Sequence, residues 1–281
     1  MTVTDPLRWQ ATDPVRAGSL SDARLQLHYA VQFAAALGIS YLEHGPDDGH
    51  TNLGWNAELG ALVSRSATGS GAVAIGIRVR DLTVLVMRDG ALTDQFPLGG
   101  LTFAAAGVRM GAALSSAGLD EGRYTLERHY ELPVHAVATG GAFGTDDVAA
   151  FGELARWFAN AAIALGRVAE EVPGATEVRV WPHHFDIATL VRYGGDASTG
   201  AGLEPGDGYY DEPYFYVNAH PQPSAERLSA RLAGNGRWHT KDWIGAVLRG
   251  SDVTGNEAAQ ERQVNAFLDS ALAACRGLVG A

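Results

Sequence analysis

Hydrophobic residues recur at helical spacing in the first strongly patterned segment of the chain. The apolar positions between Leu27 and Ala34 repeat every three or four residues, so they fall on one face of an α-helix. Ser21 is a suitable N-cap before this pattern, and Gly38 is a suitable residue to end it. The pattern therefore predicts a helix over residues 21–37.

The next part of the chain, from Trp55 to Pro97, has the composition of β-strands. Two runs within it, 72–80 and 82–87, are rich in the β-branched residues that strands favour. The Arg88-Asp-Gly90 tripeptide that follows is typical of a tight turn between antiparallel strands. We therefore expect a hairpin, in which the chain returns as a third strand before Pro97.

The rest of the chain repeats this order of helices and strands. An irregular stretch over 122–144 precedes a long helix, for which Thr145 is a suitable N-cap. Periodicity and composition predict helices over 101–116, 146–171, 243–249 and 257–275, and strands that begin at 177 and include 184–193, 214–220 and 237–243.

The order helix, strands, helix thus occurs twice, with a division near residue 140. Runs of strands followed by helices favour an α+β fold with mainly antiparallel sheet over a doubly wound parallel sheet. We expect two similar halves, residues 1–139 and 140–281, with the candidate site in the second half. Close packing of the two halves into a single domain is the alternative.

Composition limits both the partners and the chemistry. The 281 residues carry a formal net charge of −11, which argues against nucleic acid and anionic membranes as partners. The single cysteine, Cys275, excludes an intramolecular disulfide framework and a cysteine-rich metal site. The segment from Met1 to Pro6 lacks the features of a signal peptide, and no apolar stretch approaches the ~20 residues of a membrane span. We therefore expect a cytoplasmic protein.

Polar residues that can carry chemistry concentrate in the second half. If residues 184–193 form a strand, side chains alternate between its two faces. His184, Asp186 and Arg192 then share one face, and the opposite face is largely apolar. This alternation predicts a strand with one face in the core and one face open to a ligand.

A second polar strand is expected over 214–220, where Tyr216, Asn218 and His220 share a face. Antiparallel pairing of the two strands places the end of this one beside the start of the first. The imidazole of His220 then approaches the histidine and the aspartate of the first strand. Asp207, from the loop that joins the two strands, falls in the same neighbourhood.

Three chemistries fit this cluster. As metal ligands, His184, Asp186 and His220 can hold a divalent ion such as zinc or iron with open positions for a substrate. Without a metal, His184 is the base, Asp186 its orienting partner and His220 a second base. In the third interpretation, the pair of His184 and Asp186 is structural, because buried polar groups are usually hydrogen-bonded. The expected substrate-binding residues are Asp207, Tyr216, Asn218 and Arg192.

The first half contains weaker candidates. The loop after the first helix carries two histidines, His44 and His50, and three acidic residues, Glu43, Asp47 and Asp48. A solvated loop explains this pattern well, and the loop becomes functional only if tertiary contacts bring it to other site residues. His129 and His135 flank Pro133 in irregular chain and are candidates for site lining.

Three segments carry a resemblance to known proteins. They are Val180-Trp-Pro-His-His-Phe-Asp-Ile-Ala188, Glu204-Pro-Gly-Asp207 and Pro213-Tyr-Phe-Tyr-Val217. They resemble an uncharacterised bacterial protein family, largely actinobacterial, with the pattern Trp-Pro-Glu-His-Phe-Asp, Ser-Pro-Gly-Asp and Pro-Tyr-x-Tyr-Val. Gly141-Ala-Phe-Gly-Thr145 is similar to the same group.

The resemblance implies a site location and not a reaction. His183 stands where the family pattern has glutamate, and Glu204 stands where it has serine. Together with the residue patterns, it predicts a protein that binds a small molecule, with an enzyme using a His/Asp site as one form of this function. The alternative is a non-catalytic module that binds a ligand or a protein.

Overall fold

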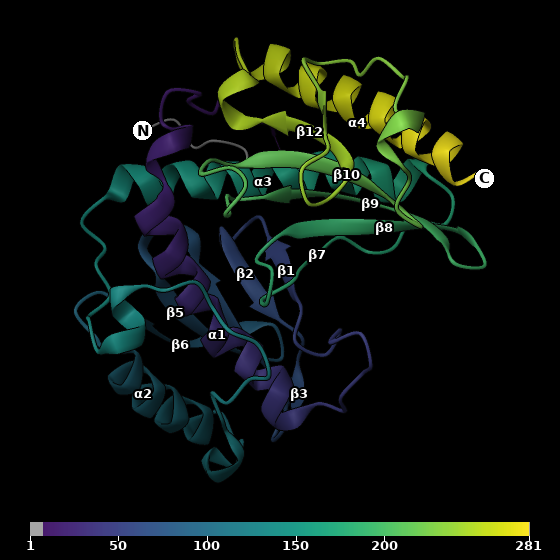
Figure 1. Ribbon diagram of the computed structural model, residues 1–281. Helices are drawn as coiled ribbons and strands as arrows, with labels where there is room; N and C mark the ends of the chain where they lie inside the picture. The colour runs from purple at the N-terminus through teal and green to yellow at the C-terminus, as the bar shows by residue number, and fades with distance from the viewer. Residues whose placement is uncertain (1–7, 281) are drawn as a thin grey trace. The chain divides into compact units, whose positions relative to one another are not determined.

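The computed structural model of the protein describes residues 8–280, and the segment from Met1 to Pro6 discussed above lies outside them. The fold is α+β, as the sequence predicts, and its strand pairings are antiparallel (Figure 1). The helices are α1 (Ser21–Tyr41), α2 (Phe103–Ser116), α3 (Val148–Glu171) and α4 (Glu257–Val279). The strands of the first half are β1 (Leu53–Asn56), β2 (Ala61–Ser64), β3 (Ala67–Thr68), β4 (Ala72–Arg78), β5 (Thr83–Arg88) and β6 (Ala91–Pro97). Those of the second half are β7 (Arg179–Val180), β8 (Ile187–Gly194), β9 (Ala197–Glu204), β10 (Tyr214–His220), β11 (Arg237–His239) and β12 (Gly245–Arg249).

The chain forms two compact units. One, here called the N-terminal unit, comprises Asp22–Ala155 and the short segment Val180–Phe185. The other, the C-terminal unit, comprises Arg156–Arg179, the chain from Asp186 onward, and the described residues up to Ser21. The chain therefore passes from one unit to the other within α3, and again at residues 180 and 186. The pattern of helices and strands in the sequence does not mark these positions.

The N-terminal unit is built on a sheet with the strand order β1-β2-β4-β5-β6, and β3 pairs with β4. The helix α1 is buried along most of its length, because apolar and small residues occupy every side of it. Phe33 of α1 stacks on Phe103, the first residue of α2, with ring centroids 4.7 Å apart. The returning segment 180–185 joins this unit through Val180, which pairs with Leu53 of β1.

The C-terminal unit has the strand order β11-β12-β10-β9-β8. The helix α4 packs on β9, β10 and β12, as Figure 1 shows for the yellow helix above the green strands. From α3, Trp157 packs against Phe215 of β10 with ring centroids 6.4 Å apart. Arg167 of α3 also forms an ion pair with Asp269 of α4, at 2.6 Å. The two helices and the sheet thus enclose one apolar core.

Two sequence predictions for the C-terminal unit are wrong. Residues 243–249, predicted as a helix, contain β12, because this short segment pairs with strands on both sides. Residues 202–204, which belong to the predicted loop between the strands 184–193 and 214–220, form the end of β9. Its glycines and small residues have low strand propensity, but pairing with β8 and β10 supplies the hydrogen bonds that hold it extended.

Within the described residues, α3 is the helix that is long and apolar enough, by length and composition, to cross a membrane. Of its most apolar stretch, 61% is buried inside the protein. Core helices of globular proteins pass the same test, so this property is weak evidence for a membrane span.

Candidate functional site

The predicted pairing of residues 184–193 with 214–220 is wrong, because β9 lies between β8 and β10. Both strands are antiparallel to β9 and therefore run in the same direction. His220, at the end of β10, pairs with Ser198, whereas Asp186 lies at the opposite end, before the first residue of β8. The expected approach of His220 and Asn218 to Asp186 does not occur, and both are exposed in this unit.

The structure instead brings Asp186 to Tyr216. The hydroxyl of Tyr216 donates a hydrogen bond of 2.5 Å to Asp186 Oδ2, and its ring covers Gly202, where a Cβ would lie 2.7 Å from the ring. Burial, and next the charge of Asp186, raise the pKa of Tyr216 well above its usual value. The hydroxyl therefore stays protonated and remains a donor. Asp186 is itself buried, which favours a structural role for this pair.

Asp207 lies in the loop between β9 and β10, where its carboxylate holds the loop by hydrogen bonds. Its Oδ1 accepts hydrogen bonds from the backbone N–H groups of Tyr209 and Tyr210, at 2.8 and 2.9 Å. Its Oδ2 accepts one from the hydroxyl of Tyr214, at 2.8 Å. Three donors thus occupy this carboxylate. Arg192, the remaining predicted substrate-binding residue, is exposed near the far end of β8, opposite Ser198.

His184 belongs to the N-terminal unit, in the turn that precedes β8. The strand begins only at Ile187, so His184 does not share a strand face with Asp186. The predicted core alternation beyond that point is confirmed, since Ile187, Thr189 and Val191 are buried. Among residues 8–280 no group of three or more His, Cys, Asp or Glu side chains is arranged to hold a metal ion.

The turn that carries His184 is fixed to α1. The carbonyl oxygen of Pro182 accepts hydrogen bonds from His28 Nε2, at 2.8 Å, and from Gln32 Nε2, at 3.0 Å. Phe185, with a φ of 76°, stacks on the His28 ring at a centroid distance of 4.6 Å. Burial lowers the pKa of His28 from 6.5 to about 4, so this imidazole is neutral at pH 7 and Nε2 carries the donated proton.

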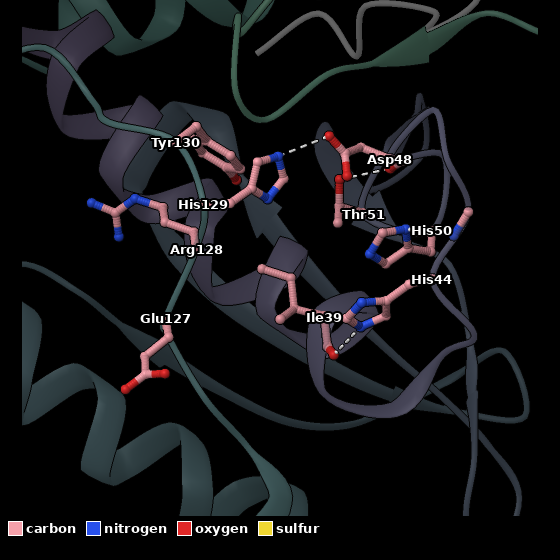
Figure 2. Close-up of a pocket in the computed structure, with 10 residues that line it drawn as sticks. Ile39, His44, Asp48, His50, Thr51, Glu127, Arg128, His129 and Tyr130 are labelled. Atoms are coloured by element: carbon pink, nitrogen blue, oxygen red, sulfur yellow. Dashed lines mark hydrogen bonds and ion pairs between the residues drawn. The ribbon is translucent and has the colours of Figure 1, made fainter.

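A cavity of about 470 Å³ lies elsewhere in the N-terminal unit, and Figure 2 shows its lining. Two chain segments form most of its wall: the loop after α1, over 44–51, and the irregular segment 127–130. Its lining residues are Ile39, His44, Gly45, Asp48, His50, Thr51, Glu127, Arg128, His129 and Tyr130. The weaker candidate loop of the sequence analysis therefore lines a cavity together with His129.

The imidazole of His129 faces the carboxylate of Asp48 across this cavity. Nε2 of His129 lies 3.1 Å from Asp48 Oδ2, and the exposed fractions of the two side chains are 68% and 28%. The loop holds Asp48 in place, because its carbonyl oxygen accepts hydrogen bonds from the backbone N–H and the hydroxyl of Thr51, both at 2.9 Å. Asp48 has a φ of 56°, a conformation that aspartate and asparagine tolerate better than most residues.

Tyr130 fixes the neighbouring wall. Its hydroxyl donates to Gln32 Oε1 of α1 at 2.8 Å, and its ring meets the His129 ring edge to face, at a centroid distance of 5.3 Å. Burial raises the pKa of Tyr130 to about 12, so the hydroxyl stays protonated. His183 lies on the other side of Tyr130, with ring centroids 5.7 Å apart. Burial, and next the charge of His184, lower the pKa of His183, and its Nδ1 is buried without a hydrogen-bond partner among the described residues.

His44 and His50 form the opposite wall. Their rings stack at a centroid distance of 4.4 Å, and His44 Nε2 is bonded to the carbonyl oxygen of Ile39 at 2.8 Å. Nδ1 of His50 accepts the backbone N–H of Gly45 at 3.3 Å. Burial and the neighbouring His44 lower the pKa of His50, so its neutral form, with the proton on Nε2, is favoured.

A second pair of histidine and aspartate provides an internal comparison. His135 Nε2 lies 3.0 Å from Asp22 Oδ1, and His135 Nδ1 accepts the backbone N–H of Val137 at 3.3 Å. Both ring nitrogens of His135 are therefore occupied, whereas Nδ1 of His129 has no hydrogen-bond partner among the described residues. In Figure 2 this nitrogen points away from Asp48 towards the space bordered by Ile39 and His50.

Comparisons of the chain with protein-family models, with curated proteins and with solved structures find no match.

Proposed function

We propose that the protein binds a small polar molecule in the cavity of the N-terminal unit. The observation that carries this proposal is the convergence of His44, His50, His129 and Asp48 on one cavity from two chain segments about 80 residues apart. Pockets that bind small molecules typically combine apolar walls with a few convergent polar groups. Here Ile39 and the aromatic ring of Tyr130 supply the apolar surface.

The distribution of charge supports a polar ligand that is not strongly charged. Asp48 is already paired with His129, and burial favours the neutral form of His50. In Figure 2 the side chains of Glu127 and Arg128 point away from the imidazoles. The groups left for a ligand are therefore imidazole donors and acceptors, which suit hydroxyl, carbonyl and amide groups.

A thermal-shift screen of small polar compounds tests the proposal. A compound at 100 times its dissociation constant stabilises the folded state by about 2.7 kcal/mol, which raises the melting temperature by several degrees. We expect hits that stabilise the wild type and lose this effect in His129→Ala and His50→Ala. The His220→Ala variant, which changes an exposed histidine of the other unit, serves as the matched control. Hits that stabilise all three variants equally would contradict the proposal.

A non-catalytic module is the second candidate function, and one observation favours it. Asp186, which the strand pattern predicts as the partner of His184, is buried and accepts a hydrogen bond from the hydroxyl of Tyr216. In this alternative the family-like segments stabilise the fold and the cavity only binds its ligand. It predicts that Tyr216→Phe lowers stability while the affinity of cavity ligands stays the same.

A further inference from the structure

The cavity brings together two imidazoles with different partners: His129 lies against Asp48, and His50 Nδ1 accepts the backbone N–H of Gly45. We propose that the protein hydrolyses a small ester, with His129 as the general base that activates water and His50 as the donor that stabilises the oxyanion. This inference rests on the proposed function, because it requires that the ester occupies the same cavity.

The contact with Asp48 determines which ring nitrogen of His129 is left for a ligand. Nε2 lies 3.1 Å from the carboxylate oxygen of Asp48, so Nδ1 is the ring nitrogen left to accept a proton. That nitrogen faces the cavity and has no partner among the described residues (Figure 2). A carboxylate that orients an imidazole, with the second nitrogen free to accept a proton, is the arrangement that general-base catalysis requires.

His50 has the complementary arrangement. Its Nδ1 accepts the Gly45 N–H, so the neutral ring carries its proton on Nε2. Because burial and His44 favour the neutral form, His50 offers a hydrogen bond without competing with His129 as a proton acceptor. The charged or titratable groups that act on His50 are His44, Asp48, Asp47 and His129.

The cavity provides water as the nucleophile. Its lining contains no serine or cysteine, the Thr51 hydroxyl donates to the carbonyl oxygen of Asp48, and the Tyr130 hydroxyl donates to Gln32. The His129 side chain is 68% exposed, so water reaches it. An open cavity favours hydrolysis over chemistry that needs water to be excluded.

The steps balance without a further reactant. Water attacks the carbonyl carbon of the ester, a new C–O bond forms, and His129 Nδ1 takes the proton from water. The carbonyl electron pair moves to the oxygen, which accepts a hydrogen bond from His50 Nε2. The bond to the leaving oxygen then breaks, and the proton on His129 passes to that oxygen. The products are a carboxylic acid and an alcohol.

Hydrolysis of p-nitrophenyl acetate by the intact protein tests this inference. We expect a rate above that of free imidazole at nine equivalents, the number of histidines in the chain. We expect His129→Gln to lower kcat by at least about tenfold, as for the loss of a general base. Asp48 acts as a positioning residue, so Asp48→Asn should lower kcat and leave KM within about twofold, since asparagine retains the shape and tolerates the φ of 56°.

Two matched controls accompany these variants. Asp89→Asn makes the same change of charge at another aspartate with a positive φ, 52°, and His135→Gln breaks a histidine–aspartate pair that is not part of the lining of this cavity. Both should retain the wild-type rate. A wild-type rate no higher than that of free imidazole, or a rate that persists in His129→Gln, overturns the inference. If screened compounds still bind in the cavity in that case, the proposed function stands and only the hydrolysis is refuted.

Discussion

Protonation of His28 should destabilise the protein at acidic pH. This imidazole is 4% exposed, stacks on Phe185 and donates to the carbonyl oxygen of Pro182. Burial is the main cause of its lowered pKa, and the charges of Arg24, Arg128 and His183 lower it further, whereas the bond to Pro182 raises it. The folded protein therefore binds this proton more weakly than the unfolded chain.

The difference between the two pKa values sets the magnitude. The pKa is 6.5 in the unfolded chain and about 4 in the folded protein, a difference of about 2.5 units. One pKa unit corresponds to 1.36 kcal/mol, so protonation of His28 at acidic pH lowers the free energy of unfolding by about 3 kcal/mol. This contribution of His28 to the free energy of unfolding is fully present above pH 6.5. It is lost progressively as the pH falls from 6.5 through about 4, because the unfolded chain takes up the proton first.

Urea unfolding between pH 7 and pH 4 measures this effect. Over this range the free energy of unfolding of the wild type should fall by about 3 kcal/mol more than that of His28→Gln, because glutamine keeps a donor towards Pro182 but has no titratable group. His220→Gln, which removes an exposed histidine, should lose as much as the wild type. Equal pH dependence in the wild type and His28→Gln would refute the assignment of a buried, neutral imidazole.

Two further substitutions test the packing around the two candidate regions. Gly38→Ala places a Cβ against the carbonyl oxygen of His50, so it should lower the free energy of unfolding by about 1–3 kcal/mol and weaken ligand binding in the cavity. Gly166→Ala, whose Cβ lies in open space on α3, should be neutral or stabilising, and equal melting temperatures for the two variants would contradict this prediction. Tyr216→Phe removes the hydroxyl that donates to the buried Asp186, so it should lower the free energy of unfolding in urea by about 2 kcal/mol, whereas Tyr209→Phe, at an exposed ring, should leave it almost unchanged. An unchanged free energy of unfolding in Tyr216→Phe would show that this hydrogen bond contributes no stability.

The fold class and most elements follow from periodicity, because local patterns decide them. The helix predicted over residues 21–37 is present, and so is the alternation of Ile187, Thr189 and Val191 in the core. Local patterns failed where pairing overrides propensity. Residues 197–202 are all small and include two glycines, yet together with Leu203 and Glu204 they form β9 between β8 and β10, and this strand separates His220 from Asp186.

The cavity could be predicted only in part. The loop with His44, Asp48 and His50 has a visible polar pattern, but a solvated loop shows the same pattern. His129, which meets this loop across the cavity, lies about 80 residues further along the chain, in an irregular segment without periodicity. The contact depends on Tyr130, whose hydroxyl reaches Gln32 of α1, and such long-range side-chain contacts leave no local signal.

Chemical-shift mapping of a bound compound tests the central claim most directly. A hit from the thermal-shift screen is titrated into ¹⁵N-labelled protein, and the amide shifts are followed by NMR. Ligand binding in the cavity predicts shifts concentrated in residues 44–51 and 127–130, which His129→Gln abolishes or reduces strongly. Shifts concentrated around Asp186, Asp207 and Tyr216 instead would contradict the claim and return the site to the strands that the sequence first indicated.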